Sequence, residues 1–289
     1  MFKKILLPVD FSENSLIAAR HAAALACHEH AELTLLHVNE LSIFHPLAGP
    51  LGFGISERDA ALNQHMAGRR KELDAFALAE LAGIPTKRIV CCGEPSKVIV
   101  ERARAENTDL IMIPTRGHGP LRHFLLGSVT AKVLHDAECP VWTSTHDGIA
   151  QAPAPVHHVM CAVNFDPCSR AVIPWAARFA AEFGARLTVV HSVCHTPPEL
   201  PERYRAAWHE EAFWRADERV HSLLRELGVQ SEVLIVDSSE PAKSLAAAAR
   251  EKGAGLLVIG RGSSTANSGR LGSHAYGIIC QSPCPMISV

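Results

Sequence analysis

The sequence predicts an α/β protein made of two tandem doubly wound domains, each a five-stranded parallel sheet with helices on both faces. Two observations lead to this prediction. Residues 5–39 align without a gap to residues 159–193, and the pairing resumes at Glu94-Pro95 with Glu240-Pro241. A repeat near half the chain length indicates two copies of one complete domain. Within each half, short continuous apolar runs alternate with helical patterns, which is typical of parallel strands buried on both faces.

The length and composition fit an ordinary globular protein with two domains. Its 289 residues allow about 145 per domain. Of all residues, 47% are hydrophobic and 20% are charged. A formal net charge of −2 excludes the overall basic field that attracts nucleic acid or an anionic membrane surface. We expect domain 1 at residues 1–147, a linker at about 148–155 and domain 2 at residues 156–289.

Three features of the sequence predict a cytoplasmic protein. No apolar run approaches the ~18 residues that a membrane span needs. The apolar stretch Ile5–Val9 is too short for a signal peptide and reads better as a first core strand. The chain has nine cysteines, an odd number, so we do not expect a disulfide framework.

The first half begins with a strand and a helix. Lys4–Val9 is an apolar run that predicts a strand buried on both faces, and it ends at Asp10. Ser12 is a suitable N-cap for a helix with an apolar face between Leu16 and Ala26. Residues 33–38 form the next apolar run, which predicts the second strand.

A long loop and a long helix follow. Residues 39–56 combine glycines and prolines with several apolar residues, which suggests a lid or a contact surface. Residues 57–82 have a helical pattern, and Gly83-Ile84-Pro85 ends it. The rest of this half is expected to hold strands at 87–91, 110–113 and 141–145 and helices from Pro95 and from Gly127 to Asp136.

The second half repeats this order. Apolar runs predict its strands at residues 159–163, 187–191, 232–236, 256–259 and 286–289. Helical patterns begin at Pro167, run through 213–227, and begin again at Pro241 and Gly272.

Polar and small residues gather where the first and fourth strands of the first half end. Asp10 closes the first strand, and we expect its carboxylate to face the crevice at the carboxyl edge of the sheet. Pro114-Thr115-Arg116-Gly117 follows the fourth strand, and nine residues later Gly127-Ser128 opens a helix. Small residues let the backbone approach a ligand, and a helix N-terminus offers N–H groups and a positive dipole end to phosphate.

These residues resemble a universal stress protein domain. ATP-binding members of that family carry G-x2-G-x9-G-[S/T] after strand four and an Asp at the end of strand one. Gly117, the spacer His118–Leu126, Gly127 and Ser128 match that pattern, as does the strand end Pro8–Ser12. The resemblance covers nearly the whole chain as a tandem protein and implies Rossmann-like, adenine-nucleotide alpha hydrolase-like domains.

The resemblance also implies a ligand and a site. The ligand would be ATP or a related adenine nucleotide, with or without Mg²⁺. Adenine would contact Asp10 and the backbone of Val38, and the phosphates would contact Gly117, Gly127, Ser128 and Val129. The complete set of residues expected to bind nucleotide in the first half is Pro8, Val9, Asp10, Val38, Thr115, Arg116, Gly117, Gly127, Ser128 and Val129.

Each half departs from the family pattern at a different place. In the first half the first glycine of the motif is Pro114, which removes an N–H. A lost charge-assisted bond of roughly 1.5–3 kcal/mol would weaken binding about tenfold to a hundredfold. In the second half Asn164 replaces Asp10, and the loop before Gly272 is one residue shorter. The residues expected to bind nucleotide in the second half are Asn164, Gly260, Gly262, Gly272 and Ser273.

Pairing of the two halves is also implied by the resemblance. Dimers of that family commonly pair their last strands, so Val141–Thr145 and Met286–Val289 would align antiparallel within one chain. This pairing covers two sheet edges that would otherwise invite aggregation. One chain would then be a built-in pseudo-dimer, and further homodimerisation is a separate question.

The leading hypothesis is a nucleotide-sensing stress protein with no catalytic residues and no metal site of its own. His37 and His191 occupy equivalent strand positions and are expected to be hydrogen-bonded core residues. Asp10 alone is insufficient for phosphoryl transfer, so at most slow ATP hydrolysis is expected. An oxidoreductase is disfavoured because no G-x-G-x-x-G follows the first strand. A nucleotide-free protein acting through oligomerisation or a bound apolar ligand remains an alternative.

Overall fold

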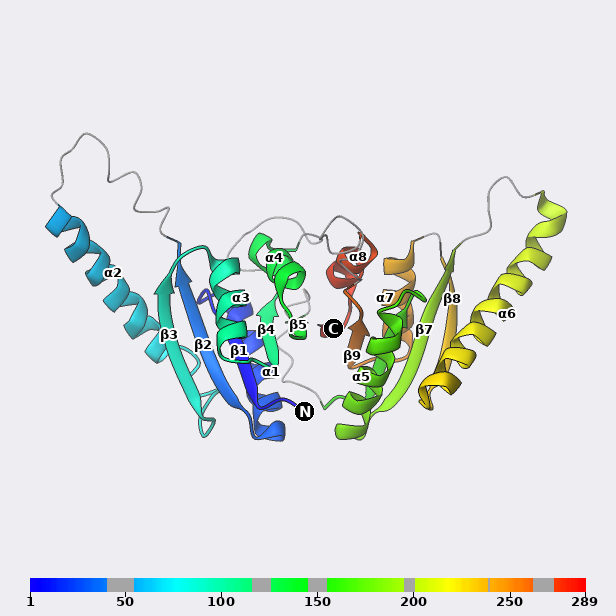
Figure 1. The fold of residues 1–289 in the computed structure, drawn as a ribbon, viewed down its shortest axis with the longest axis horizontal. Helices are drawn as coiled ribbons and strands as arrows, with labels where there is room; N and C mark the ends of the chain where they lie inside the picture. Colours follow the sequence, from blue (N-terminus) through cyan, green and yellow to red (C-terminus); the bar gives the residue numbers. More distant parts are fainter. Residues whose placement is uncertain (41–54, 116–125, 145–154, 195–200, 239, 262–272) are drawn as a thin grey trace.

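The computed structural model describes residues 1–40, 55–115, 126–144, 155–194, 201–238, 240–261 and 273–289. The expected alternation of strands and helices is present in both halves (Figure 1). The first half contains β1 (Lys4–Pro8), α1 (Glu13–Glu29), β2 (Glu32–Asn39), α2 (Ile55–Ala75), β3 (Thr86–Cys92), α3 (Pro95–Ala105), β4 (Leu110–Pro114), α4 (Ser128–Asp136) and β5 (Val141–Ser144). The second half contains β6 (His158–Val163), α5 (Ser169–Glu182), β7 (Arg186–Cys194), α6 (Glu202–Leu227), β8 (Glu232–Ser238), α7 (Pro241–Glu251), β9 (Leu256–Ile259), α8 (Ser273–Gln281) and β10 (Met286–Ser288).

The strands form one ten-stranded sheet in the order β3-β2-β1-β4-β5-β10-β9-β6-β7-β8. Within each half the strands are parallel, so the predicted α/β class with two tandem doubly wound domains is confirmed. In both halves the strand order reverses beside the first strand, between β1 and β4 and between β6 and β9. These two positions are the topological switch points of the sheet.

The two halves join through their last strands. β5 and β10 are antiparallel, with Trp142 opposite Ile287 at the centre and Val141 opposite Ser288 on one side. The expected antiparallel pairing is therefore confirmed within the described residues. It turns the two five-stranded sheets into one and leaves β3 and β8 at the far ends, beside α2 and α6 (Figure 1).

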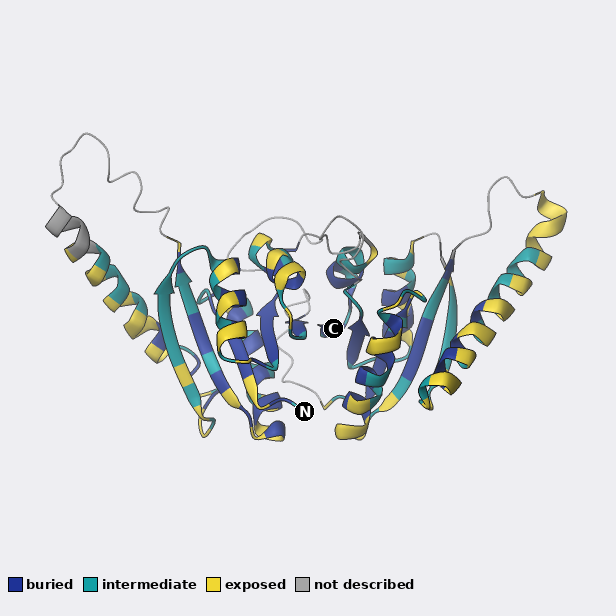
Figure 2. Ribbon diagram, in the orientation of Figure 1, coloured by how far each residue is buried: buried dark blue, intermediate teal, exposed yellow. Residues whose placement is uncertain are grey.

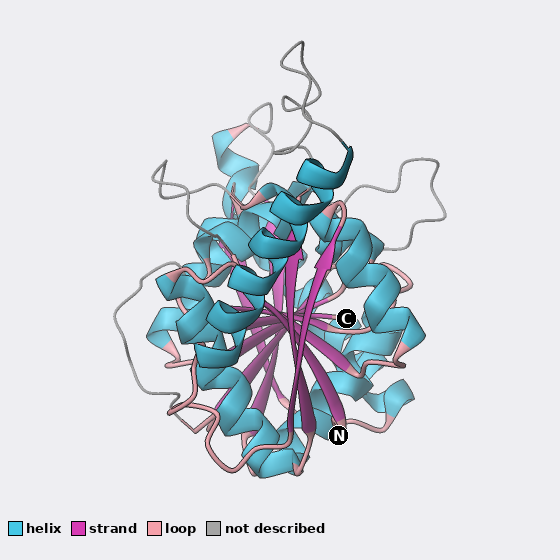
Figure 3. Ribbon diagram, turned by 90° about the vertical axis from the view of Figure 1, so that its left-hand side faces the viewer, coloured by secondary structure: helices cyan, strands magenta, loops and turns pink. Residues whose placement is uncertain are grey.

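Helices cover both faces of the sheet, and each face has its own apolar core. Strand residues alternate between the two cores, since Ile5 and Leu7 pack on one face and Leu6 on the other. The first core lies under α1, α2, α5 and α6, and the second lies under α3, α4, α7 and α8. Both cores run through both halves, so the inner strands are largely buried, while the edge strands β3 and β8 are only partly buried and the outer helix faces are exposed (Figure 2). Figure 3 shows the helices on both faces of the sheet.

Three helices differ in length from the sequence prediction. α2 ends at Ala75 rather than near residue 82, because Ala77 adopts a left-handed φ of 52° and Arg88 donates to the carbonyls of Leu73 and Phe76. α6 begins at Glu202 and is much longer than its apolar pattern indicated. α5 begins at Ser169 and not at Pro167; the physical reason lies in the second-half site described below.

Candidate functional site

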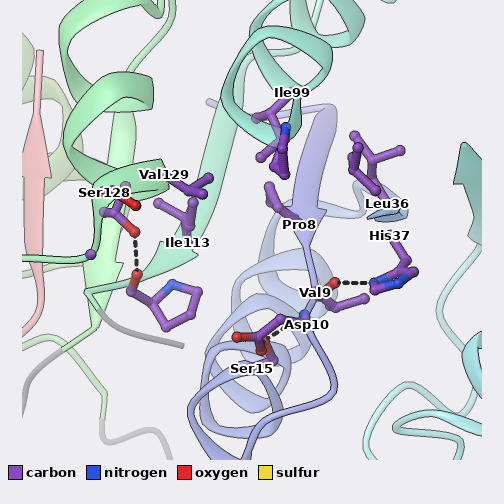
Figure 4. Close-up of a pocket in the computed structure, with 15 residues that line it drawn as sticks. Pro8, Val9, Asp10, Ser15, Leu36, His37, Ile99, Ile113, Ser128 and Val129 are labelled. Atoms are coloured by element: carbon purple, nitrogen blue, oxygen red, sulfur yellow. Dashed lines mark hydrogen bonds between the residues drawn. The ribbon is translucent and has the colours of Figure 1, made fainter. Parts of the chain in front are cut away.

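A cavity of about 300 Å³ opens at the carboxyl edge of the first-half sheet, at the switch point between β1 and β4 (Figure 4). Its walls come from the ends of β1, β2 and β4 and from the first turns of α1, α3 and α4. The lining residues are Pro8, Val9, Asp10, Ser15, Leu36, His37, Val38, Pro95, Ile99, Ile113, Pro114, Gly127, Ser128, Val129 and Thr130. Seven of the expected site residues are therefore together in one cavity: Pro8, Val9, Asp10, Val38, Gly127, Ser128 and Val129.

Asp10 is held at the end of β1 by the N-terminus of α1. Its Oδ1 accepts hydrogen bonds from the Ser12 N–H at 3.0 Å, the Ser12 hydroxyl at 2.5 Å and the Ser15 hydroxyl at 2.6 Å. Phe11 turns the chain from strand to helix with a φ of 65°, a region that non-glycine residues rarely adopt. The carboxylate lines the cavity as expected, but one of its oxygens is engaged by α1.

His37 forms the β2 side of the cavity and is fixed by the strand beside it. Its Nδ1 lies 2.8 Å from the carbonyl oxygen of Val9, which can only accept, so Nδ1 carries a proton and donates it. The ring also packs against Phe11 with centroids 4.3 Å apart. His191 has the same arrangement in the second half, with Nδ1 donating to Val163 at 2.8 Å and Phe165 at 4.3 Å. Both histidines are the hydrogen-bonded residues that the sequence suggested.

The N-terminus of α4 forms the opposite side of the cavity. Gly127 is the N-cap, and its own N–H donates to the carbonyl of Thr115 at 2.9 Å. The Thr130 hydroxyl donates to the carbonyl of Pro114 at 2.9 Å, which ties the first turn of α4 to the end of β4. The first N–H groups of a helix have no intrahelical acceptor, so Ser128, Val129 and Thr130 present theirs at this end. Gly127 contributes its lack of a side chain rather than its N–H.

Of the other three expected residues, the structure describes only Thr115. Thr115 does not line the cavity, because its side chain is buried toward β5 and donates to the Ser144 carbonyl at 3.2 Å. Its carbonyl instead receives the Gly127 N–H and so brings the two ends of the intervening segment together. Arg116 and Gly117 lie outside the described residues.

The second half has a cavity of about 400 Å³ at the equivalent switch point. Asn164 and Gly260, two of the residues expected there, line it. The full lining is Ala162, Val163, Asn164, Asp166, Ser169, Val172, His191, Ser192, Pro241, Leu245, Ile259, Gly260, Arg261, His274, Ala275 and Ile278. Gly262 and Gly272 lie outside the described residues, and of Ser273 only its place as the first residue of α8 is described.

The second-half cavity keeps a carboxylate, at a position that the sequence prediction missed. Asp166 occupies the place of Ser12, two residues beyond Asn164, and lines the cavity. Its Oδ1 accepts the Ser169 N–H at 3.0 Å, and its carbonyl accepts the same N–H at 3.1 Å, so an i→i+3 turn precedes the regular helix α5. The aligned repeat already indicated this carboxylate, because the Asp-x-Ser sequence of the first half aligns with Asn-x-Asp in the second.

The switch-point residues of the fourth strands also differ. A Cβ added at Gly260 would lie 3.1 Å from Val172 Cγ2 and 3.2 Å from Cys168 Cβ, so a larger residue there would require these neighbours to shift by a few tenths of an ångström. The repeat places Ala18 in the first half where Val172 stands in the second. Alanine has no Cγ, so the Val172 Cγ2 contact has no equivalent beside Pro114.

Side chains of the second half hold α4 of the first half near both of its ends. The Tyr276 hydroxyl of α8 accepts the backbone N–H of Leu126 at 3.2 Å, just before the N-cap of α4. The Arg261 guanidinium donates to the carbonyls of Ala137 at 2.6 Å and Cys139 at 2.9 Å, at the C-terminal end of α4. This position suits a cation because the C-terminus of a helix carries partial negative charge. Burial lowers the pKa of Arg261 below its usual value.

Two kinds of feature have no candidate among the described residues. No group of three or more His, Cys, Asp or Glu side chains among these residues could hold a metal ion. Among the described helices, none is long and apolar enough to cross a membrane.

Comparison with known proteins gives a consistent family match. A family model described as the universal stress protein family matches residues 1–144 and again residues 155–289. A universal stress protein of Methanocaldococcus jannaschii is 34% identical over 151 residues, covering 49% of this chain and 93% of that protein. A universal stress protein of Mycobacterium bovis is 26% identical over 265 residues, covering 89% of this chain and 86% of that protein.

Solved structures agree on the fold. The crystal structure of a universal stress protein from Archaeoglobus fulgidus superposes with a TM-score of 0.69 at 24% identity. The match covers 99% of this chain and 95% of that one, so the tandem arrangement of two domains is shared.

Proposed function

Because the chain belongs to the universal stress protein family and carries its domain twice, we propose that the first half binds an adenine nucleotide, with ATP as the leading ligand. Binding would report the nucleotide to a partner during stress. The observation that carries the proposal is the first-half cavity, which combines a carboxylate at one side with a helix N-terminus at the other.

The two sides of the cavity suit the two ends of a nucleotide. Asp10 and the backbone of Val38 lie at the ends of β1 and β2, where they would contact the adenosine end. Ser128 and Val129 open α4, where N–H groups and the helix dipole favour phosphate. Gly127 would let the phosphates approach, and Arg116 and Gly117 are proposed to complete this end. Any Mg²⁺ would enter on the phosphate oxygens, which are its usual ligands beside water.

A second nucleotide site is proposed in the second half with lower affinity for phosphate-rich ligands. Asn164 and Gly260 line its cavity, and Gly262, Gly272 and Ser273 are proposed to complete it. We also propose the domain boundaries given above, with a linker at about 148–155, and a cytoplasmic location for the protein.

The central experiment is Gly127→Asp. Aspartate is a favourable N-cap residue, so its carboxylate would accept the first N–H groups of α4 and stabilise the helix. The same carboxylate would place negative charge where phosphate is proposed to bind. We expect affinity for labelled ATP to fall at least a hundredfold in the first half, with an unchanged or slightly higher melting temperature.

Gly127→Asn is the matched control. Asparagine has the same shape and is an equally good N-cap, but it carries no charge, so its loss of affinity should be smaller, about tenfold. The corresponding Gly272→Asp variant reports on the second half. Unchanged ATP affinity of Gly127→Asp in a calorimetric titration would reject the proposed site.

Two further measurements separate this proposal from its alternatives. Adenine nucleotide released from freshly purified, denatured protein supports a binding protein over a nucleotide-free one. Multiple-turnover ATP hydrolysis that is lost in Asp10→Ala would instead indicate a catalyst.

A further inference from the structure

Two lysines share one carboxylate at Glu94, directly before the cavity-lining residue Pro95. Glu94 Oε1 lies 2.6 Å from Lys132 Nζ, and its Oε2 lies 3.1 Å from Lys97 Nζ. The Ser96 hydroxyl donates to Oε1 at 3.1 Å. The hydrogen bond from Lys132, followed by those from Lys97 and Ser96, lowers the pKa of Glu94 to about 2. The carboxylate is therefore ionised at neutral pH, and Lys132 remains charged.

The pair of Glu94 and Lys132 connects the two helices that border the cavity. Glu94 is the N-cap of α3 and precedes Pro95, which lines the cavity. Lys132 lies one turn after Ser128 on the exposed side of α4, and helix side chains lean toward the N-terminus. The charge of Glu40, at the end of β2, helps to raise the pKa of Lys132. The ammonium group therefore lies at Glu94, the residue directly before the cavity-lining Pro95.

We propose that Lys132 exchanges Glu94 for the terminal phosphates of a bound nucleoside triphosphate, and that this exchange makes the first half prefer triphosphates to monophosphates. The inference rests on the proposed function and adds the ligand's phosphate number to it. An ammonium is a suitable partner for phosphate, and the α4 N-terminus already brings phosphate to this side of the cavity. An exposed ion pair contributes little stability, so Glu94 can release Lys132 at low cost.

The second half supplies a natural contrast. Glu240 and Lys243 stand in the places of Glu94 and Lys97 and form the same pair, with Nζ 2.7 Å from Oε2. Gly277 stands in the place of Lys132. A Cβ added at Gly277 would lie 3.2 Å from Ala242 Cβ, so α7 and α8 pack closely there. Lys132 on α4 therefore has no counterpart on α8, and we expect the preference for triphosphates in the first half alone.

The test uses the full chain and reads each half separately. Photolabelling with radioactive 8-azido-AMP, followed by digestion and peptide mapping, shows which half is labelled. Competition by unlabelled AMP and ATP then gives an apparent affinity for each ligand in each half. In Lys132→Gln we expect the ATP affinity of the first half to fall about tenfold while its AMP affinity changes less than twofold.

Three control variants sharpen the test. Lys97→Gln removes the second lysine that is paired with Glu94 and should leave the ratio of ATP to AMP affinity within twofold of the wild type. Glu94→Gln keeps an acceptor for Ser96 but releases Lys132, so ATP affinity should rise about threefold. Glu240→Gln, its counterpart, should leave the second half unchanged.

The outcomes separate the two proposals. An intact fold in which AMP and ATP both fail to compete in the first half overturns the proposed function and this inference with it. Competition by both ligands, with an unchanged ratio of ATP to AMP affinity in Lys132→Gln, overturns the inference alone.

Discussion

Helices α4 and α8 occupy equivalent places in the two halves, yet the opposite half holds them differently. α4 is held near both ends, by Tyr276 and Arg261. In the aligned repeat, Ala131 takes the position of Tyr276 and Thr115 takes the position of Arg261. Both side chains are too short to support α8 in the same way. Within the described residues, the second half therefore supports the first without an equivalent return. The supported helix is the one at which phosphate is proposed to bind.

The first prediction tests the larger of these two supports. Arg261→Ala removes two hydrogen bonds from a partly buried cation to the C-terminal end of α4. Hydrogen bonds that involve a charged group contribute about 1.5–3 kcal/mol, so we expect the free energy of unfolding to fall by about 2–3 kcal/mol. Urea denaturation followed by circular dichroism measures this change.

Thr115→Ala is the comparison variant from the first half. Thr115 donates one neutral hydrogen bond to Ser144, so its loss should cost about 1 kcal/mol or less. Equal destabilisation by both variants would show that the support of α4 by Arg261 is not a distinguishing feature of the second half.

A second prediction concerns the residue that most clearly departs from the family motif. Pro114→Gly restores a backbone N–H at the end of β4, where the second half has Gly260. If that N–H reaches the ligand, ATP affinity of the first half should rise about tenfold. Pro114→Ala restores the N–H without the added flexibility of glycine and should show most of the same gain. A gain in the glycine variant alone would attribute the effect to flexibility.

The smallest effect is expected at the other end of the supported helix. Tyr276→Phe removes the acceptor of the Leu126 N–H while keeping the ring that packs against the second core. Leu126, directly before Gly127, would then be less well positioned, and we expect first-half ATP affinity to fall about threefold. The photolabelling experiment should show no change in the second half. A larger loss in the second half than in the first would contradict this role.

Much of the fold was predictable because it depends on local patterns repeated twice. Continuous apolar runs predicted buried parallel strands, and the resemblance predicted the antiparallel contact of β5 with β10. The ends of helices were less predictable. α2 stops early because Arg88, from a strand beyond its end, binds its last carbonyls, and no local pattern of the helix indicates that contact.

The candidate site was predictable where it follows the motif and not where it depends on the other half. Asp10 and Ser128 were found from a strand end and a helix start, and Pro8 from the family resemblance; all three line one cavity. Asp166 was missed because Asn164 was read as a lost charge, although the carboxylate had moved by two residues. Tyr276 was missed because its contact with Leu126 exists only after two distant segments meet across the sheet.

The antiparallel contact of β5 with β10 also changes what a single mutation can do. In a symmetric homodimer every substitution appears on both sides of the two-fold axis. A residue that supports the other copy and the group that it contacts must then both be present in each copy. Fusion of the two copies in one chain removes this constraint, because each substitution occurs once. Trp142 opposite Ile287 at the centre of the contact is one such unmatched pair. The shared sheet has therefore allowed two copies of one domain to evolve as different parts.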